Sequence, residues 1–586
     1  MAKVWRIFPH DSARIAALQQ QARVPPVIAQ LLLSRGIHEA SHAGEFLECK
    51  LTGLRDPELL PGLPNAADRI HAAVQAKRKI VVYGDYDADG MTAAAILYRC
   101  LKLLGAEVET FVPSRLDEGY GLHGDALRRL ADRGASLVVT VDCGIASVAE
   151  ADVARELNLE LIITDHHEPG SELPRAAAIV HPRLPGHHYP FDGLCGAGVA
   201  LKVAWAICQR HCGAKKVTQN LREFLLQAVG LAALGTVADV VPLLDENRVL
   251  VRHGLSMLKE RPVPGLAALY PLAKVSSKEA FASEDLAFSL APRLNAAGRL
   301  GQAALGVELL TTDLLERANA LAEHVHRLNS DRDSLERKVL RAATEQIEEH
   351  FDPVNDPALV LAGRGWHPGV IGIVAGRIAE KHHRPTIVIS LDEFGGKPGV
   401  GSGRSACGLN LHHALAACRD HLVSCGGHAA AAGLKVEEDR VDTFRAAFCE
   451  HVSAEVAPAD RIAEIQIDAE TALGHLTLQT VEAMERLSPF GQCNPRPVLC
   501  VSGVMLAEPP KKMGEGERHL AVTLHHQGKR IRGIAFGKAE WADELAKAGP
   551  LDIAFRPVIN EFRGYKNVEI HLVDWRPSMV AAAVTS

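Results

Sequence analysis

Aromatic residues are scarce in this chain, at 5% of 586 residues, although 47% of the residues are hydrophobic and 23% are charged. These hydrophobic and charged fractions are typical of a globular protein with buried cores. Since a chain of this length exceeds the size of a single hydrophobic core, we expect roughly three or four domains. With so few aromatic residues, the cores are expected to consist mainly of Ala, Leu and Val.

The chain also has no excess of positive charge. Its formal net charge is -7, so the protein as a whole does not attract a polyanion. If the partner is a nucleic acid, it has to be held by metal ions and by local basic patches. Overall charge therefore leaves the class of partner open.

Signals for zinc and for ATP binding are missing as well. The 12 cysteines include no Cys-x-x-Cys pair, and the closest approach, ICQRHC with Cys208 and Cys212, lacks a second half-site. Unpaired cysteines in a long chain indicate a reducing compartment. There is no P-loop, and the run GVGSG is not a dinucleotide-binding fingerprint, so ATP-driven action is not indicated.

Secretion and membrane signals are not evident. The N-terminus, MAKVWRIFPHDS, contains no apolar core of a signal peptide. The longest apolar run, residues 225–244, is interrupted by Gln227, Asp239 and Pro242. Because an aspartate inside a membrane span is costly, we interpret this run as a buried segment, and we expect a cytoplasmic protein with no membrane partner.

Changes of pattern along the chain predict a multidomain α/β protein. From residue 79, β-rich runs alternate with helical runs, as in βαβ units with a parallel sheet. Residues 314–350 contain neither Gly nor Pro, which predicts a helix of about ten turns. Closely spaced C-terminal strands, about five in number, predict a small barrel of the OB type. The expected segments are an N-terminal helical extension at 1–70, the parallel-sheet domain at 71–312, a connecting helix at 313–352, a smaller α/β domain at 353–457 and an OB-like domain at 458–578.

Acidic motifs fall at the ends of the predicted strands. Because parallel strands bring their carboxyl ends to one edge of a sheet, the first three groups, all except Asp239, are expected to lie together. Carboxylates with imidazole but without thiolate suit Mg²⁺ or Mn²⁺ better than structural zinc, and enough ligands are present for two ions. The side chains are Asp85, Asp87 and Asp89 after IVVY, Asp142 after SLVVTV, the triplet Asp165, His166 and His167 after LELIIT, and Asp239 in GTVADVVPL.

Each motif also has a simpler explanation. A single Asp-x-Asp at a strand end is usually a solvated turn or a helix N-cap. A pair of histidines means little alone, because such pairs also begin at residues 187, 382, 412 and 525. The occurrence of all three motifs in one βαβ array is what favours a metal site.

These motifs resemble those of the DHH phosphoesterase family, which is named for its Asp-His-His triplet. GDYDADGMT, VDCG, TDHHE and the later Asp239 are similar to the successive motifs of that family. Farther along, SLAPRLNAAGRLG, GWHPGVIGIVAGRI, GSGRSACGLNL and GGHAAAAG resemble motifs of its single-strand-specific exonucleases. The likeness extends along nearly the whole chain. It implies a DHH domain, the connecting helix, a DHHA1-type domain and the terminal barrel.

The resemblance also implies roles for the clustered side chains. Asp142 would bridge two Mn²⁺ or Mg²⁺ ions, and Asp85 would support the ions or contact a water that they bind. His167 would contact the phosphate, which makes Asp85, Asp142 and His167 the expected catalytic residues. The implied metal ligands are Asp87, Asp89, Asp142, His166 and Asp239.

The later motifs supply polar side chains for the substrate. Guanidinium groups are suited to hydrogen bonds with phosphates, and the glycines of GSGRS and GGH allow close backbone approach. For any single arginine, a surface salt bridge is an equally good explanation. Besides His167, the implied substrate contacts are Arg293, Asn295, Arg299, His367, Arg377, Ser402, Arg404 and His428.

The C-terminal module combines basic and aromatic residues. Grooves lined in this way bind single strands with little sequence preference. We expect about half of these aromatic rings to belong to the barrel core instead. The residues are Lys511, Lys512, Arg518, Lys529, Arg530 and Arg532, with Phe536, Phe555, Phe562 and Tyr565.

The resemblance implies a 5′→3′ exonuclease that degrades single-stranded DNA to 5′-mononucleotides by two-metal hydrolysis, in DNA recombination and repair. The implied partners are single-stranded DNA, a helicase and a single-strand-binding protein, and the chain is expected to be a monomer. One alternative is a DHH phosphodiesterase of short oligonucleotides or cyclic dinucleotides, whose relatives generally lack the connecting helix and the barrel. Another is a non-catalytic single-strand-binding relative, which should have lost its carboxylates.

Overall fold

The computed structural model describes residues 3–114, 119, 121–352, 355–562 and 564–579. The chain divides into two compact units. Residues 1–2 of the expected N-terminal extension and residues 353–354, at the start of the expected second α/β domain, lie outside the described residues. The larger unit contains Leu54–Val241 and Glu246–Ala463, and the smaller contains Lys3–Gly53, Pro242–Asp245 and Glu464–Ser586.

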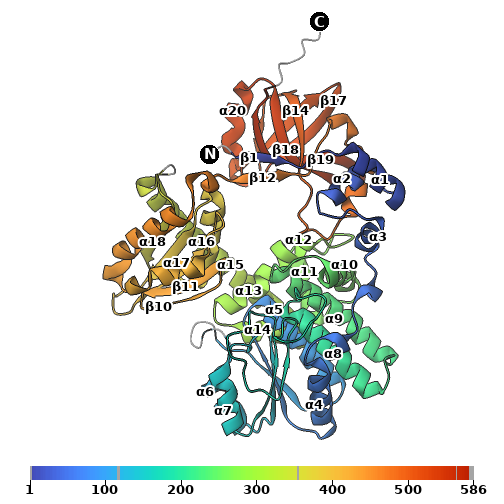
Figure 1. Ribbon diagram of the computed structural model, residues 1–586, viewed down its shortest axis with the longest axis vertical. Coiled ribbons are helices and arrows are strands. Elements are labelled where there is room, and N and C mark those ends of the chain that lie inside the picture. Colours follow the sequence, from blue (N-terminus) through green and yellow to red (C-terminus); the bar gives the residue numbers. More distant parts are fainter. Residues whose placement is uncertain (1–2, 115–118, 120, 353–354, 563, 580–586) are drawn as a thin grey trace. The chain divides into compact units, whose positions relative to one another are not determined.

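A five-stranded parallel sheet in the order β3-β2-β4-β5-β6 begins the larger unit. Helices α6 and α7 pack on one face, and α5 and α8 cover the other (Figure 1). This covering explains why β2 and β4 are apolar and buried along their whole length. The elements are α4 (Leu63–Gln75), β2 (Ile80–Gly84), α5 (Ala88–Leu103), β3 (Val108–Phe111), α6 (Gly124–Asp132), β4 (Leu137–Val141), α7 (Val148–Glu156), β5 (Glu160–Thr164) and β6 (Ala178–Val180).

A helical region follows the sheet and ends in one long helix. Helix α9 is long and apolar enough to cross a membrane, but most of it is buried here against α5 and α8, as expected for a core helix. The long helix α15 occupies the segment predicted to be the connecting helix. The elements are α8 (Gly196–Cys212), α9 (Gln219–Ala238), α10 (Asp245–Glu260), α11 (Pro264–Leu272), α12 (Ser283–Asp285), the π-helical segment η3 (Leu286–Leu290), α13 (Ala291–Arg299), α14 (Ala303–Thr311) and α15 (Leu315–His350).

The second α/β region contains a mixed sheet in the order β10-β11-β9-β8-β7. Strands β7 and β8 are parallel, joined by helix α16, and the other pairs are antiparallel. The run GVGSGR is strand β9, so its glycines lie in a sheet and not in a loop. The elements are β7 (Leu359–Arg364), α16 (Pro368–His382), β8 (Thr386–Leu391), β9 (Gly399–Arg404), α17 (Leu411–Ala417), β10 (Ser424–Gly427), β11 (Ala431–Val436) and α18 (Val441–Glu455).

The smaller unit contains a ring of strands. Its seven-stranded sheet has the order β13-β14-β18-β19-β17-β16-β15, and an additional pairing of β14 with β16 closes the ring. The five ring strands are the five that the sequence predicts. The elements are β12 (Glu464–Ile467), β13 (Ala469–Glu470), α19 (Leu478–Glu485), β14 (Leu499–Leu506), β15 (Lys511–Met513), β16 (His519–His526), β17 (Lys529–Ala535), α20 (Ala542–Lys547), β18 (Leu551–Phe562) and β19 (Tyr565–Pro577).

The N-terminal segment is a part of this smaller unit and not a separate extension. Strand β1 (Val4–Ile7) pairs with β12, although the helical pattern predicts no strand there. Helices α1 (Ser12–Ala22), α2 (Pro26–Leu33) and α3 (Ala40–Glu48) bury apolar residues in the same core as the ring strands. Helices this short gain most of their stability from tertiary packing. The larger unit begins at Leu54. This boundary lies inside segment 1–70, which the sequence predicts to be one N-terminal helical extension.

Candidate metal centre and active site

Three loops bring acidic side chains to the carboxyl edge of the parallel sheet. Asp85 follows β2, Asp142 follows β4, and the Asp-His-His triplet follows β5. These strands are neighbours, and the register pairs the last residue of β2 with the last of β4 and the last of β4 with the last of β5. The three motifs therefore meet at one edge, as expected from the alternation of strands and helices.

The alternating aspartates form the start of helix α5 and not a strand-like turn. Asp87 is the N-cap, and its Oδ1 accepts hydrogen bonds from the backbone N–H groups of Asp89 (2.9 Å) and Gly90 (3.0 Å). A Cβ at Gly90 would lie 2.7 Å from the carbonyl oxygen of Asp85, so only glycine allows this tight turn. The helix N-cap role and the metal-site role of this motif are therefore compatible, because the N-cap hydrogen bonds fix the positions of the carboxylates.

The N-terminus of α8 holds the Asp89 carboxylate. Its two oxygens accept hydrogen bonds from the backbone N–H groups of Gly196 (2.7 Å) and Ala197 (2.9 Å). A Cβ at Gly196 would lie 2.5 Å from Asp142 Oδ1, so glycine lets α8 approach the carboxylates. The positive end of the helix dipole favours negative charge at this place.

Asp142 and Asp239 enter the cluster from different kinds of element. Asp142 has a φ of 63°, a left-handed conformation that aspartate tolerates better than most residues, and it turns the chain away from β4. Asp239 caps the C-terminus of α9, and its N–H donates to the Gly235 carbonyl at 2.9 Å. The expectation that every acidic motif lies at a strand end is wrong for Asp239, because the preceding residues continue a buried helix.

The His166 imidazole lies among the carboxylates. Its Nε2 is 3.1 Å from Asp142 Oδ1, 3.6 Å from Asp239 Oδ2 and 3.9 Å from Asp89 Oδ2. Possible ligand atoms within 4.8 Å of one another form two main sets, and a third set that contains Asp142 and His166 connects them. The two main sets are Asp85, Asp87 and Asp142, and Asp89, His166 and Asp239.

The protonation of these groups fits a site made for cations. Burial, with the charges of Asp89 and Asp87, raises the pKa of Asp239 to about 9. Burial also raises the pKa of Asp142 well above its usual value, and burial lowers the pKa of His166 to about 3, which leaves the neutral imidazole that metals bind. In the described part of the chain, the buried atoms Asp239 Oδ2 and His166 Nε2 have no hydrogen-bond partner. Divalent ions such as Mn²⁺ or Mg²⁺ would satisfy these atoms and favour ionised carboxylates.

Asp165 is a functional residue to which the sequence reasoning gave no role. Its Oδ1 accepts hydrogen bonds from the backbone N–H of His166 (2.7 Å) and lies 2.7 Å from His167 Nδ1, while Oδ2 accepts from the N–H of Ile145 (2.9 Å). Although burial lowers the pKa of His167, its hydrogen bond to Asp165 and the charge of Asp165 raise it to about 9. Asp165 thus keeps His167 cationic and fixes the direction of its ring. The only signal for this role is its place in the triplet.

Helix α13 lies against the acidic turn and contains three of the predicted substrate residues. The backbone N–H of Ala88 donates to Asn295 Oδ1 at 2.8 Å, so Asn295 holds the turn itself. Arg293 is half-buried, and its Nη2 donates to the Leu272 carbonyl at 3.3 Å. Arg299 Nη1 donates to the carbonyl of Gly369 at 3.3 Å, which links α13 to the start of α16.

The remaining predicted substrate residues lie in the second α/β region. His367 caps α16, since its Nδ1 accepts a hydrogen bond from the Gly369 N–H at 3.0 Å. On strand β9, Arg404 Nη1 donates to Ser402 Oγ at 3.1 Å, and both side chains face the glycine-containing side of α16. Arg377 and His428, the last two predicted substrate residues, form no hydrogen bond with these side chains within the described residues. Arg377 forms an ion pair of 2.8 Å with the buried Glu336, and exposed His428 follows β10 without a hydrogen bond from its ring in the described part of the chain.

The ring module of the smaller unit exposes part of the predicted basic and aromatic set. Lys511 and Lys512 lie on β15, and three further cations lie on β17. Phe536 is exposed beside the His519 and His571 rings, and Tyr565 is 76% exposed. Phe555 is fully buried in the core, so it is not a stacking surface, and the Phe562 side chain lies outside the described residues. The three cations of β17 are Lys529, Arg530 and Arg532.

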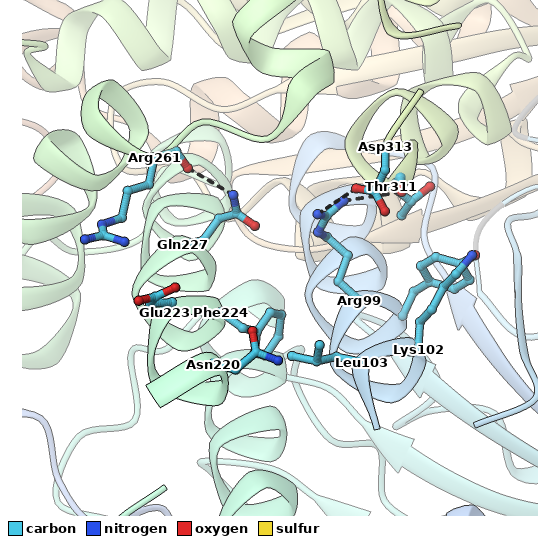
Figure 2. Close-up of a pocket in the computed structure, with 11 residues that line it drawn as sticks. Arg99, Lys102, Leu103, Asn220, Glu223, Phe224, Gln227, Arg261, Thr311 and Asp313 are labelled. Atoms are coloured by element: carbon cyan, nitrogen blue, oxygen red, sulfur yellow. Dashed lines mark hydrogen bonds and ion pairs between the residues drawn. The ribbon is translucent and has the colours of Figure 1, made fainter. Parts of the chain in front are cut away.

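A separate surface pocket lies away from the acidic cluster (Figure 2). It has a volume of about 540 Å³ and lies between the C-terminal half of α5 and the N-terminal half of α9. In Figure 2, Arg99 points toward Asp313, with which it pairs at 3.0 Å. Tyr98 is ten residues from Ala88, or about 15 Å along the helix, so this pocket is not the reaction site.

Three family models match successive parts of the chain. They describe the N-terminal domain of the DHH family at residues 79–235, the DHHA1 domain at 355–454 and the RecJ OB domain at 467–574. Together with the carboxylate–imidazole centre, they define a phosphoesterase of the DHH class.

Full-length comparisons narrow this class. The chain is 38% identical over 570 residues to the single-stranded-DNA-specific exonuclease RecJ of Bacillus subtilis (strain 168), covering 97% of this chain and 70% of that protein. It is similar to crystal structures of Thermus thermophilus RecJ with Mn²⁺ (TM-score 0.82, 32% identity, 98% of this chain and 79% of that chain) and with Mg²⁺ (TM-score 0.76, 31% identity, 98% and 78%). The chain belongs to the RecJ family of single-stranded-DNA-specific exonucleases.

Proposed function

We propose that this protein is a 5′→3′ exonuclease that hydrolyses single-stranded DNA to 5′-mononucleotides with two Mn²⁺ or Mg²⁺ ions. The observation that carries the proposal is the position of Asp142. Its carboxylate belongs to the ligand set of Asp85 and Asp87 and also lies 3.1 Å from His166 Nε2 of the other set. Membership of the RecJ family supplies the substrate class and the polarity.

The chain's own residues would bind the ions and orient the phosphate. When bound, the ions would supply a nucleophile at neutral pH and neutralise phosphodiester oxygens. His167, kept cationic by Asp165, would donate a hydrogen bond to a phosphate oxygen, which is stronger than one between neutral groups. Asn295 holds the turn from Asp85 to Asp89 through Ala88. Arg299, Ser402 and Arg404 would contact the phosphates of the strand.

Two observations bear on the alternatives. Every predicted carboxylate ligand is present at the sheet edge, which argues against a non-catalytic single-strand-binding relative. The long helix α15 and the ring module are present as well, whereas a phosphodiesterase of short oligonucleotides or cyclic dinucleotides needs neither. The helix and the ring module favour an enzyme that holds a longer strand.

Family membership also supports a wider setting for this activity. We place the enzyme in DNA recombination and repair, in the cytoplasm, as a monomer that acts with a helicase and a single-strand-binding protein. The net charge of -7 means that strand binding depends on local basic surfaces and on the ions. Those surfaces include the β15 and β17 cations of the ring module.

A digestion experiment tests the proposal. Single strands labelled at the 5′ or the 3′ end are incubated with the wild type or with Asp142→Ala, in Mn²⁺ or Mg²⁺. The wild type should release labelled mononucleotide first from the 5′ end. The variant should retain its fold but lose nearly all turnover, since one ligand set loses a member and the other loses the carboxylate that lies 3.1 Å from His166 Nε2. Release from the 3′ end first, or normal turnover by the variant, would contradict the proposal.

A further inference from the structure

Phe288 is an exposed aromatic residue in an unusual segment. Its side chain is 78% exposed, although burying a phenylalanine stabilises a fold by about 1.5–3 kcal/mol. It lies in the π-helical segment η3, and such segments are rare and occur frequently at functional sites. No aromatic or cation–π contact of Phe288 is present among the described residues. A large ring is therefore held out from the surface in a chain that has few aromatic residues.

The neighbours of Phe288 fix its outward direction. Leu286 and Leu290 are fully buried, and Leu294 continues the same buried face into α13. Phe288 lies midway between the first two leucines in sequence, so it occupies the opposite face of the segment. Burial of the leucines therefore keeps the phenylalanine exposed without need of any other partner.

The segment is continuous with the helix that touches the metal centre. Asn295 on α13 accepts the hydrogen bond from Ala88 at 2.8 Å, and a Cβ at Gly298 would lie only 1.9 Å from the carbonyl oxygen of Tyr86. Seven residues separate Phe288 from Asn295, which is roughly 10 Å along a helix axis. That distance corresponds to about three nucleotides of a stacked strand at 3.4 Å each.

Arg293 connects the segment to its surroundings. Its Nη1 donates to the carbonyl of Ser289, the residue after Phe288, while Nε lies 3.3 Å from His326 Nδ1 on α15. The Arg293 guanidinium therefore links the π-helical segment to helix α15. It also places positive charge at the carbonyl of Ser289, next to the exposed ring in sequence, as a sugar–phosphate backbone beside a stacked base requires.

We propose that the Phe288 ring stacks on a nucleobase of the bound single strand, a few nucleotides from the phosphodiester that is cleaved. The proposal rests on the proposed exonuclease function and adds a contact that is made to the base and not to the backbone. Stacking on a ring tolerates every base, so it suits a nuclease without sequence preference. It also requires an unpaired base, which contributes to selection of single strands.

The test compares strands with and without bases. Wild type, Phe288→Ala and Phe288→Trp are assayed for kcat/KM on a single strand and on a matched strand whose first six nucleotides from the attacked end are abasic. Phe288→Ala should lower kcat/KM roughly 5- to 150-fold on the normal strand, which is the range for loss of one stacked base. On the abasic strand, Phe288→Ala and the wild type should be equal, and Phe288→Trp should match the wild type on both strands.

Phe394 supplies the matched control, because it is 92% exposed in the turn after β8 and far along the chain from α13. Phe394→Ala should leave the ratio between the two strands unchanged. If Phe288→Ala lowers kcat/KM equally on both strands, the ring acts on the fold or on the backbone, and the stacking proposal is wrong. An unchanged kcat/KM would also overturn it. Failure of the wild type to digest the normal strand would instead refute the exonuclease function itself.

Discussion

Two adjacent histidines of one triplet have opposite protonation behaviour. Burial lowers the pKa of His166 to about 3, whereas the hydrogen bond and charge of Asp165 outweigh burial and raise the pKa of His167 to about 9. His166 is therefore neutral and His167 is a cation at neutral pH. One short motif thus offers the proposed site both a neutral imidazole, the form that metals bind, and a positive group.

Asp165→Asn should separate these roles. The wild-type His167 is charged below a pKa of about 9. With a neutral amide as partner, burial still lowers the pKa of His167 while the charge of Asp165 no longer raises it, so the pKa should fall, although Asp239 and Asp85 still raise it. At pH 8 a smaller share of His167 would be charged in the variant, and kcat should drop by up to on the order of 100-fold, the loss for removal of one charge-stabilising donor. NMR titration of the histidine signals measures the pKa directly.

Asp152→Asn is the control, because Asp152 pairs with Arg155 on the surface of α7. This change should leave both the His167 titration and kcat unaltered. If Asp165→Asn leaves the His167 pKa near 9, another group sets the charge of His167, and the role assigned to Asp165 is wrong.

At the scale of elements, the sequence predicts most of what positions the site. Alternating β-rich and helical runs indicate the five strands β2 to β6, and the absence of Gly and Pro indicates α15. The pattern does not show that GDYDADG starts a helix, since an N-cap aspartate and a turn aspartate look alike in sequence. It also misses that Asp239 ends a helix, because a continuously apolar run has no period to distinguish a buried helix from a strand.

Contacts between distant elements could not be predicted in the same way. The link from Asn295 to Ala88 joins residues 207 positions apart, and it depends on how closely α13 approaches the acidic turn. The motif SLAPRLNAAGRLG indicated a substrate contact, and the structure adds that Asn295 supports the turn. The short π-helical segment before α13 has no recognisable sequence signature.

Gly298→Ala should test this helix contact. A Cβ at residue 298 would lie 1.9 Å from the carbonyl oxygen of Tyr86, so α13 has to move away from the turn. Displacement of catalytic groups by about 1 Å can cost on the order of 100-fold in rate, and we expect a loss of kcat of this size. Thermal unfolding should show destabilisation of about 1–3 kcal/mol from overpacking.

Gly44→Ala in helix α3 is the matched control, since nothing lies within 4 Å of its added Cβ. There the better helix propensity of alanine should stabilise the protein by about 1 kcal/mol and leave kcat unchanged. Wild-type activity in Gly298→Ala would show that the packing of α13 against the turn is not needed for catalysis.

At the scale of the whole molecule, residues 3–53 and the C-terminal ring module lie in one compact unit. Strand β1 pairs with β12, and helices α1 to α3 share a core with β14, β16, β17, β18 and β19. The sequence could not indicate this arrangement, because the two ends of the chain are more than 400 residues apart and their apolar faces carry no mark of their partner. The larger unit, which contains the metal centre, is built from the residues between them.

Leu32→Ala should therefore destabilise the ring module although it lies near the N-terminus. Leu32 is fully buried in the shared core, and truncation of such a leucine costs about 2–5 kcal/mol. Urea unfolding followed at two probes, one in each unit, should show an earlier transition for the smaller unit. Leu59→Ala, at an exposed leucine, should change stability by less than about 0.5 kcal/mol. Equal transitions for Leu32→Ala and the wild type would contradict the shared core.

Crystals grown in Mn²⁺ test most directly whether the site holds two ions and whether Asp142 is shared between both ion positions. Anomalous diffraction at the manganese absorption edge locates each ion without reference to the fold. Two peaks are expected about 3.5–4 Å apart, one beside Asp85 and Asp87, the other beside Asp89, His166 and Asp239, with Asp142 between them. A single peak, or two peaks that do not share Asp142, would contradict the account.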